Sequence, residues 1–281
     1  MTEYSIWIPV YDGNNILRRK FETGAPVSQV IPFHNTNPVF WVFDGRNALQ
    51  SRRKIFPDYK IKRDRETPTV NGFYEFARTV KAELLPYCRN VTIIEVEGME
   101  ADDIIAHLVG ETNKSNLLKG NHEANQAGRA EGIGIDIISN DGDFYALESL
   151  GGVRLEKKPK WADSVAPDDV RLYKTLVGDS SDNIPGLRLF GDKAWLSLLP
   201  ADKEGWKYWL EGNDSLEDFL KGGLGKAQLE WWNNGGRALL RDYWNVVGFL
   251  PVEAVALAAG TRHGIADVNA YQATMAKYMW M

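Results

Sequence analysis

The stretch IWIPVYDG, residues Ile6–Gly13, is an apolar run that stops at an aspartate followed by glycine. The pattern recurs in VFWVFDG at residues 39–45 and in IDIISNDG at residues 135–142. Asp-Gly pairs favour hairpin turns, but a hairpin needs a second alternating strand directly afterwards. The residues that follow look helical in two cases and are basic in the third, so hairpins are disfavoured. The three runs are therefore expected to be strands of an open, mostly parallel sheet.

The segments around these runs alternate between helix and strand patterns. Residues 69–87 have helical periodicity, and the face that it predicts to be buried carries Phe73, Phe76, Ala77, Val80 and Leu84. Residues 91–96 form a β-branched run, and a helix is expected over about residues 100–109. Residues 113–132 are polar and are expected to form a loose surface loop. The predicted fold class is α/β, with helices on both faces of the sheet.

The pattern becomes helical from Pro167 onward, with several glycine-rich breaks. Seven of the ten tryptophans lie at or beyond Trp195, and we expect them in the core of a helical subdomain. The expected division is therefore an α/β domain at residues 1–160, which includes a basic segment at 45–68, and a helical subdomain at 161–281.

The composition excludes several classes of protein. Hydrophobic residues make up 44% and charged residues 25%, which is ordinary for a globular chain and excludes disordered, collagen-like and coiled-coil proteins. The single cysteine, Cys88, excludes an internal disulfide and a cysteine-rich zinc site. No basic leader and no long apolar run is visible, so a soluble, cytoplasmic protein without a membrane partner is expected. A net charge of −5 argues against a wholly basic nucleic-acid coat but does not exclude nucleic acid.

Carboxylates gather at the predicted strand ends and in two further motifs. In open parallel sheets, ligands bind beyond the carboxyl ends of the strands, where Asp12, Asp44 and Asp141 would converge. The motif EGMEADD at 97–103 and the motif GDSSDNIPG at 178–186 add more acids. Helix caps, turns and the helix dipole are the structural alternatives for each motif alone. The complete set comprises Asp12, Asp44, Glu100, Asp102, Asp103, Asp141, Asp143, Asp179 and Asp182.

Nine clustered carboxylates need a counter-charge, because mutual repulsion would otherwise force some of them to take up protons. Oxygen ligands favour hard divalent ions such as Mg²⁺ or Mn²⁺ over zinc. Two such ions about 4 Å apart can activate a water and stabilise a leaving oxygen in phosphodiester cleavage. The chemistry that this set indicates is therefore metal-dependent phosphoryl hydrolysis.

A basic segment follows the second Asp-Gly strand end. Residues 46–65 contain eight basic residues and two acids, Asp58 and Asp64. One interpretation is a solvated loop, and the other is a wall that binds the phosphates of nucleic acid. Tyr59 could stack on a base. The basic residues are Arg46, Arg52, Arg53, Lys54, Lys60, Lys62, Arg63 and Arg65.

The motifs YDGNN, FDG with SRRKIFPDYKIKR, EGMEADD, SNDGDF and GDSSDNIPG, in this order, resemble the 5′-nucleases of the flap endonuclease superfamily. That superfamily includes the 5′-nuclease domain of bacterial DNA polymerase I and bacteriophage 5′–3′ exonucleases, and the resemblance spans about residues 4–200. It implies a PIN-like fold with a helical clamp, and two or three divalent ions held by the nine carboxylates. It also implies that Lys60 and Arg63 contact the region of the scissile phosphate.

Two departures from the family pattern stand out. In GLRLFGDKAW, residues 186–195, Gly186, Gly191 and Lys193 match a helix–hairpin–helix-type DNA-binding element, but Leu189 replaces the middle glycine. That replacement puts close approach to a duplex phosphate and a K⁺ site there in doubt. The bridge from Lys60 to Phe73 is short, which resembles some phage exonucleases more than flap-threading enzymes.

The resemblance implies a 5′–3′ exonuclease that acts on duplex or branched DNA, with flap endonuclease or RNase H activity on RNA–DNA hybrids as extensions. A monomer is favoured, located in the host cytoplasm if a phage encodes it. Two alternatives stay open: a PIN-type ribonuclease that acts on RNA, and a non-catalytic protein that binds branched DNA. Complete retention of the carboxylates speaks against the second of these.

Overall fold

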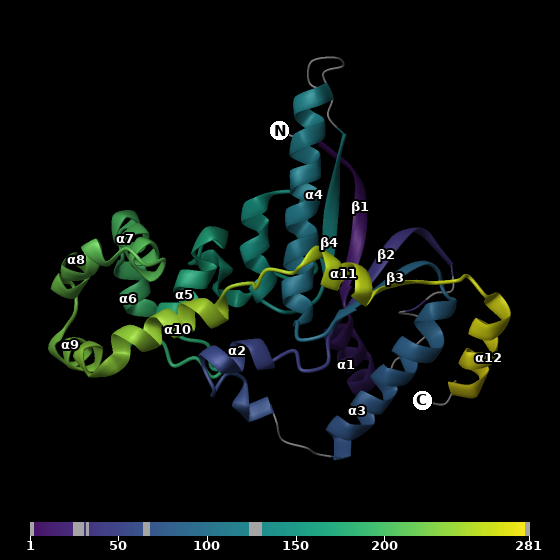
Figure 1. The fold of residues 1–281 in the computed structure, drawn as a ribbon, viewed down its shortest axis with the longest axis horizontal. Helices are drawn as coiled ribbons and strands as arrows, with labels where there is room; N and C mark the ends of the chain where they lie inside the picture. The colour runs from purple at the N-terminus through teal and green to yellow at the C-terminus, as the bar shows by residue number, and fades with distance from the viewer. Residues whose placement is uncertain (1–2, 25–30, 32–33, 64–67, 124–130, 279–281) are drawn as a thin grey trace. The chain divides into compact units, whose positions relative to one another are not determined.

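The computed structural model of this 281-residue chain describes residues 3–24, 31, 34–63, 68–123 and 131–278 (Figure 1). The chain forms two compact units, each built from segments that are distant in sequence. The first unit comprises Met1–Ala48, Glu66–Pro159 and Leu250–Met281, and the second comprises Leu49–Arg65 and Lys160–Phe249. The second unit resumes at Lys160. The basic segment was expected in the α/β domain, but residues Leu49–Arg65 belong to the second unit. The C-terminal residues were expected in the helical subdomain, but Leu250–Met281 belong to the first unit.

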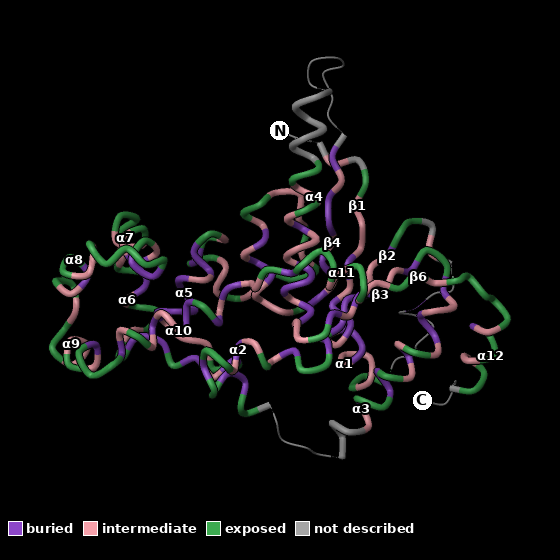
Figure 2. The backbone as a smooth tube through the Cα atoms, viewed as in Figure 1, coloured by how far each residue is buried: buried purple, intermediate pink, exposed green. Residues whose placement is uncertain are grey.

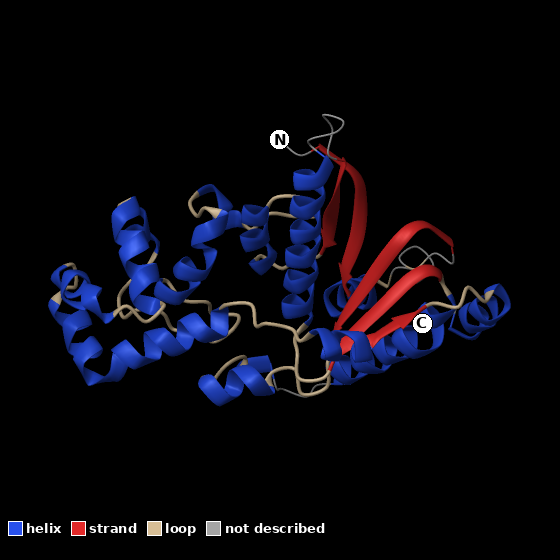
Figure 3. Cartoon of the chain, turned by 45° about the horizontal axis from the view of Figure 1, so that its top comes forward, coloured by secondary structure: helices blue, strands red, loops and turns tan. Residues whose placement is uncertain are grey.

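The first unit is built on a six-stranded sheet with the order β5-β4-β1-β2-β3-β6. Its strands are drawn in red in Figure 3. The strands β1 to β5 pair in parallel, and β6 pairs antiparallel with β3. In the central register, Asp12 lies opposite Val42 and Tyr11 lies opposite Ile138. The predicted mostly parallel sheet is thereby confirmed. The strands are β1 (Glu3–Asp12), β2 (His34–Asp44), β3 (Arg89–Val96), β4 (Glu131–Ile138), β5 (Val153–Leu155) and β6 (Thr261–His263).

Helices cover both faces of this sheet. On one face, Trp41 and Phe43 of β2 pack in a buried cluster with residues of α1 (Gly13–Thr23), α3 (Pro68–Thr79) and α12 (Val268–Tyr278). After α3, the chain continues through a π-helical turn, η3 (Val80–Leu84), and a 3₁₀ turn, η4 (Leu85–Tyr87). The face predicted for residues 69–87 is the buried one (Figure 2). Burying each large apolar side chain stabilises the fold by roughly 1.5–3 kcal/mol.

The opposite face is covered by α4 (Ala101–Glu123), whose Ile104 and Ile105 are fully buried. The helix is much longer than expected. The prediction of a loose loop at residues 113–132 was wrong for residues 113–123, which are helical, and for residues 131–132, which begin β4, whereas residues 124–130 lie outside the described residues. The buried first half nucleates the helix, so that polar residues can continue it at little cost. Asn113 also ties it to the fold, because its Nδ2 donates to the carbonyl oxygens of Leu150 and Gly151 over 3.1 Å each.

Two of the Asp-Gly glycines are required by close packing. A Cβ at Gly45 would overlap the carbonyl oxygen of Val96, and a Cβ at Gly13 would overlap the ring of Phe43. The N–H of Gly45 donates to the carbonyl of Met99 over 2.9 Å, which fastens the end of β2 to the turn before α4. Glycine therefore serves here to bring strand ends together, and the rejected hairpin turns are indeed not formed.

The C-terminal segment completes the first unit, in contrast to its expected place in the helical subdomain. β6 extends the sheet beyond β3, and α11 (Ala254–Gly260) packs against β3. The Tyr271 hydroxyl donates to the carbonyl oxygen of Ile31 over 2.7 Å. An edge strand of three residues leaves too short a pattern for sequence reasoning to detect.

The second unit is helical, and tryptophans form much of its core. The rings of Trp206, Trp209 and Trp232 lie 4.7–6.0 Å apart between centroids, and Trp195 packs edge-on against Tyr173. The predicted tryptophan core is confirmed for five residues of this unit, whereas Trp231 is only half-buried and Trp280 lies outside the described residues. The five buried residues are Trp195, Trp206, Trp209, Trp232 and Trp244. The helices are α2 (Gln50–Ile55), α5 (Val170–Leu176), α6 (Asp192–Ser197), α7 (Pro200–Leu210), α8 (Glu217–Gly222), α9 (Lys226–Trp231) and α10 (Arg237–Val247).

Short 3₁₀ and π-helical turns connect these elements. In the second unit they are η2 (Ile61–Arg63), η6 (Lys160–Asp163), η7 (Pro167–Asp169), η8 (Asp214–Leu216) and η9 (Trp232–Gly236), whereas η5 (Asp143–Leu150) follows β4 in the first unit. Within the described residues, no helix combines the length and the apolarity needed to cross a membrane.

Candidate metal centre and nucleic-acid contacts

Asp12 is the most enclosed acid at the strand ends of the first unit. It caps α1, with Oδ1 accepting from the N–H of Asn15 over 3.2 Å, and Oδ2 accepts from the Ser139 hydroxyl over 2.9 Å. Ser139 in turn accepts from the N–H of Asp141 over 3.1 Å. Burial and the negative charge of Asp44 raise the pKa of Asp12 to about 7. The acids at the ends of β1 and β2 therefore repel one another, as the sequence predicted.

Asp44 joins the end of β2 to two helices. Its Oδ1 accepts from the N–H of Ala101 at the start of α4, and its Oδ2 accepts from Asn14 Nδ2, both over 2.8 Å. Asp44 itself is exposed. Its two oxygens are thus oriented by the elements on either side and still reach solvent.

The acids around the start of α4 differ in how far they are buried. Glu100 is buried just before the helix, and Asp102 is half-buried in the first turn. Asp103 is fully buried, and its Oδ1 accepts from the N–H of Leu250 over 2.7 Å. Asp103 therefore also anchors the returning C-terminal segment, a structural role that its spacing from Glu100 does not indicate.

Asp141 and Asp143 follow β4 in a tight turn. Oδ1 of Asp141 accepts from the N–H of Asp143 over 3.0 Å, and both residues are half-buried. The neighbouring Asn140 accepts from Asn15 Nδ2 over 2.6 Å. Sequence reasoning named the aspartates and missed the polar residues that orient them: Asn14, Asn15, Ser139 and Asn140. The signal lay inside the quoted motifs, in YDGNN and SNDGDF.

In the second unit, Asp179 lies in a loop closed by paired backbone hydrogen bonds between Asp179 and Ile184, both 2.8 Å. Its Oδ2 accepts from Lys174 Nζ over 2.7 Å, and its Oδ1 accepts from the N–H and the hydroxyl of Ser181 over 2.8 and 2.6 Å. Burial opposes ionisation, but Lys174 and Ser181 outweigh it and lower the pKa of Asp179 to about 2. Asp179 is therefore charged across the physiological pH range.

The other acid of this loop, Asp182, meets the basic segment within the same unit. Lys60 Nζ lies 3.8 Å from its Oδ1, and the Tyr59 hydroxyl donates to its Oδ2 over 3.3 Å. Asn183 Nδ2 donates to the carbonyl of Asp58 over 3.0 Å. Tyr59 is thus buried with its hydroxyl engaged, which corrects the expectation that its ring stacks on a base.

One further expectation for the basic segment is corrected, and a second observation concerns its backbone. Arg52 is buried, and its guanidinium donates to the carbonyl oxygens of Val246 and Gly248 over 2.9 and 3.1 Å, so it supports α10 and cannot lie along a phosphate backbone. Lys60 has a φ of +52° ahead of η2, so Lys60 and Arg63 do not share a helical face. The reason is that the Lys60 N–H turns to the carbonyl of Asp182 instead of continuing a helix.

The remaining basic residues differ in exposure. Lys54, Lys62 and Lys193 are exposed, and Arg46 is exposed in an ion pair with Glu97 in the first unit. Arg53 donates to the carbonyl oxygens of Tyr59 and Lys60 and so supports the same turn. The side chain of Arg63 and the whole of Arg65 lie outside the described residues.

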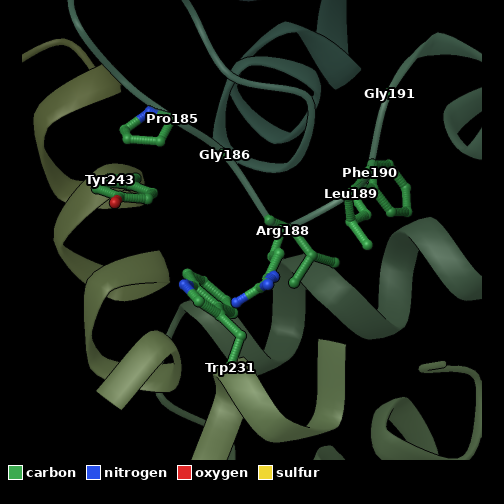
Figure 4. Close-up of a pocket in the computed structure, with 9 residues that line it drawn as sticks. Pro185, Gly186, Arg188, Leu189, Phe190, Gly191, Trp231 and Tyr243 are labelled. Carbon is green, nitrogen blue, oxygen red and sulfur yellow. The ribbon is translucent and has the colours of Figure 1, made fainter. Parts of the chain in front are cut away.

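Residues 177–191 join α5 to α6, and the turn at residues 186–191, in which the Phe190 N–H donates to the Leu187 carbonyl over 2.9 Å, is called the hairpin below. An open pocket of about 620 Å³ is lined by residues 185–191 together with Trp231 and Tyr243, and Arg188 points from the hairpin toward Trp231 (Figure 4). Leu189 is 78% exposed and has a φ of +57°, a left-handed backbone that favours glycine. Leu189 therefore adopts a backbone conformation that glycine would adopt more easily at this position.

The donor set fits hard divalent ions. The candidate ligands in each unit are carboxylates, and in the first unit burial, followed by repulsion from Asp44, raises the pKa of Asp12. A bound cation relieves that repulsion, and Mg²⁺ or Mn²⁺ prefers such oxygen donors. Asparagine, serine and backbone N–H groups hold the carboxylate oxygens in fixed directions, as orienting groups around metal ligands do.

The sequence has relatives among known proteins. Residues 10–170 match the sequence model of the family described as "5′-3′ exonuclease, N-terminal resolvase-like domain". DNA polymerase I of Caldicellulosiruptor bescii is 30% identical over 217 residues, which cover 68% of this chain and 24% of that protein. Thermostable DNA polymerase I of Thermus thermophilus is 29% identical over 238 residues, or 75% and 24%. The chain thus spans about a quarter of the length of these curated relatives.

Solved structures share the fold. The zinc-bound T5 5′-exonuclease superposes with a TM-score of 0.61 at 16% identity, covering 97% of this chain and 98% of that one. The bacteriophage T5 flap endonuclease in a complex with DNA and metal ions has a TM-score of 0.59 at 18% identity, with the same coverage. At these identities the likeness establishes the α/β fold.

Proposed function

Because this chain belongs to the family of 5′-3′ exonucleases with an N-terminal resolvase-like domain, we propose that it is a divalent-metal-dependent 5′–3′ nuclease that hydrolyses phosphodiester bonds of DNA. The observation that carries the proposal is the set of oriented acids at the ends of parallel strands, where the pKa of Asp12 is raised by burial and by Asp44. These oriented carboxylates would hold the cations that phosphodiester hydrolysis requires.

The proposed metal ligands are the nine carboxylates that the sequence singled out, with two or three Mg²⁺ or Mn²⁺ ions. When bound, such ions activate a water and stabilise the leaving oxygen. Asn14, Asn15 and Ser139 orient the carboxylates of the first unit, and Ser181 orients Asp179 in the second. Fixed donors of this kind reduce the reorganisation that metal binding would otherwise require.

The basic residues divide into two proposed roles. Lys60 and Arg63 stabilise the scissile phosphate as negative charge develops on it. The exposed Arg46, Lys54, Lys62 and Lys193, together with Arg53 and Arg65, bind the flanking phosphate backbone. The proposed substrates are duplex DNA with a 5′ end, nick, gap or flap, and RNA–DNA hybrids. We propose that the enzyme acts as a monomer in the cytoplasm, without a K⁺ ion at the 186–191 hairpin.

A cleavage assay tests the proposal. The wild-type protein is incubated with 5′-labelled duplex, nicked, flap, RNA–DNA and RNA substrates, with Mg²⁺ or with chelator. We expect Mg²⁺-dependent products on DNA, none with chelator, and none from Asp141→Asn despite retained DNA binding. Asp218→Asn is the matched control, because the Asp218 side chain in α8 is fully exposed.

Three other outcomes would each contradict one part of the proposed function. Near-normal turnover by Asp141→Asn at saturating Mg²⁺ would contradict the metal-dependent mechanism. Cleavage of RNA without cleavage of DNA would identify a PIN-type ribonuclease instead. Binding of branched DNA with no cleavage in any metal would identify a non-catalytic binding protein.

A further inference from the structure

Lys174, near the end of α5, is a buried cation that lies outside the sequence motifs quoted above. Its Nζ lies 2.7 Å from Oδ2 of Asp179, and only 8% of the residue is exposed. Because Ser181 supplies two further donors to Oδ1, three hydrogen bonds reach the Asp179 carboxylate. Asp179 is therefore charged and already compensated in the metal-free protein.

Lys174 pairs more closely with Asp179 than Lys60 does with Asp182. Lys60 Nζ is 3.8 Å from Asp182 Oδ1, a distance beyond a hydrogen bond, whereas Lys174 makes a short charge-assisted bond to Asp179. A divalent ion that approaches this loop therefore meets the positive charge of Lys174 beside one of its two acids. Coulomb repulsion between an ammonium and a divalent ion a few ångströms apart is strong in a partly buried site.

On the premise of the proposed function, we infer that Lys174 is a positioning residue that weakens divalent-ion binding by the 179–182 loop, because it holds Asp179 in an ion pair. An ion is then retained tightly at this loop only when a substrate phosphate adds further negative charge. Lys174 would thereby couple divalent-ion occupancy of the 179–182 loop to the presence of DNA.

The test measures metal binding rather than cleavage. Metal-free wild-type protein and Lys174→Met are titrated with Mn²⁺ in the absence of DNA, and free Mn²⁺ is followed by its paramagnetic resonance signal. We expect Lys174→Met to bind the weakest-held Mn²⁺ about tenfold or more tightly than wild type. With a non-cleavable duplex present, the difference between the two proteins should shrink.

Lys203→Met is the matched control. Lys203 is also a partly buried lysine of the second unit in an ion pair, with Asp169 at 2.9 Å, but it does not bond to the 179–182 loop in the described contacts. Its loss changes the net charge by the same amount, so its Mn²⁺ affinity should stay within about twofold of wild type. Equal tightening in both variants would show a general charge effect and overturn the inference.

The remaining outcomes are also decisive. Mn²⁺ binding that is independent of residue 174 would overturn the inference and leave the proposed function standing, whereas a wild-type protein that binds no Mn²⁺ would overturn the proposed function itself. If Lys174→Met does not fold, Asp179→Asn is compared with the double variant Asp179→Asn/Lys174→Met. The double variant should bind Mn²⁺ more tightly, and equal affinities would refute the role of Lys174.

Discussion

Lys60 and Asp182 contact each other twice: the Lys60 N–H donates to the Asp182 carbonyl over 3.0 Å, and Lys60 Nζ lies 3.8 Å from Asp182 Oδ1. Main chain and side chain together fix the ammonium beside a proposed metal ligand. We expect Lys60→Ala to lower the single-turnover cleavage rate on the order of 10²-fold, the size seen for loss of one positioned charge-stabilising donor. Single turnover at saturating enzyme removes the contribution of binding.

The Lys60 backbone offers a control for this prediction. Because its φ is +52°, Lys60→Gly keeps the turn without strain while it removes the side chain with its ammonium, so it should lose as much rate as Lys60→Ala. Lys62→Ala, from an exposed neighbour, should weaken binding and leave the single-turnover rate unchanged. Wild-type rates in both Lys60 variants would make this segment a docking surface with no part in the chemistry.

For Arg52 the structure predicts a role in stability, whereas its place in the basic segment predicts a phosphate contact. Arg52→Ala should reduce the free energy of unfolding by about 2–4 kcal/mol, because it leaves the buried carbonyl oxygens of Val246 and Gly248 without this donor. Urea denaturation measures the loss. Lys54→Ala, from an exposed residue two positions away, should change stability by less than about 0.5 kcal/mol and reduce the salt dependence of DNA binding. An Arg52→Ala protein with wild-type stability and weakened DNA binding would instead support a phosphate contact for Arg52.

The strand-end aspartates and Arg52 show how much of the site could be predicted from the sequence. The strand ends were predictable because an apolar run, an aspartate and a glycine signal both the strand and its carboxyl end within a few residues. The burial of Arg52 depends on carbonyl groups about 195 positions away in the chain, at the end of α10, and no local pattern encodes that contact. The return of the C-terminal segment to the sheet rests on β6, whose three residues are too few to show a period.

The metal-free protein should lose stability as the pH rises, because of Asp12. Its pKa is about 7 in the folded state against 3.8 for an ordinary aspartate, so the folded state prefers the protonated carboxyl. This contribution is fully present below pH 3.8 and is lost as the pH rises through about 7. Asp12→Asn should therefore raise the free energy of unfolding in chelator at pH 8 on the order of 2 kcal/mol, with little effect at pH 4.

Thermal melting at the two pH values measures this difference, and saturating Mg²⁺ provides the control. Bound cations remove the repulsion, so Mg²⁺ should stabilise wild type at pH 8 more than it stabilises Asp12→Asn. A variant that is destabilised equally at both pH values would show that the hydrogen bonds of Asp12 to Asn15 and Ser139 outweigh its charge.

Leu189 carries a strained backbone that glycine would relieve. With a φ of +57° and 78% exposure, its side chain contributes little packing while its Cβ disfavours the left-handed conformation. Leu189→Gly should therefore raise the free energy of unfolding by up to about 1 kcal/mol, after subtraction of the greater freedom of glycine in the unfolded chain. Leu189→Ala removes the exposed side chain but keeps the Cβ, so it should bring no gain. Urea midpoints at equal slope compare the three proteins, and a Leu189→Gly protein less stable than Leu189→Ala would show that the hairpin is not strained at this residue.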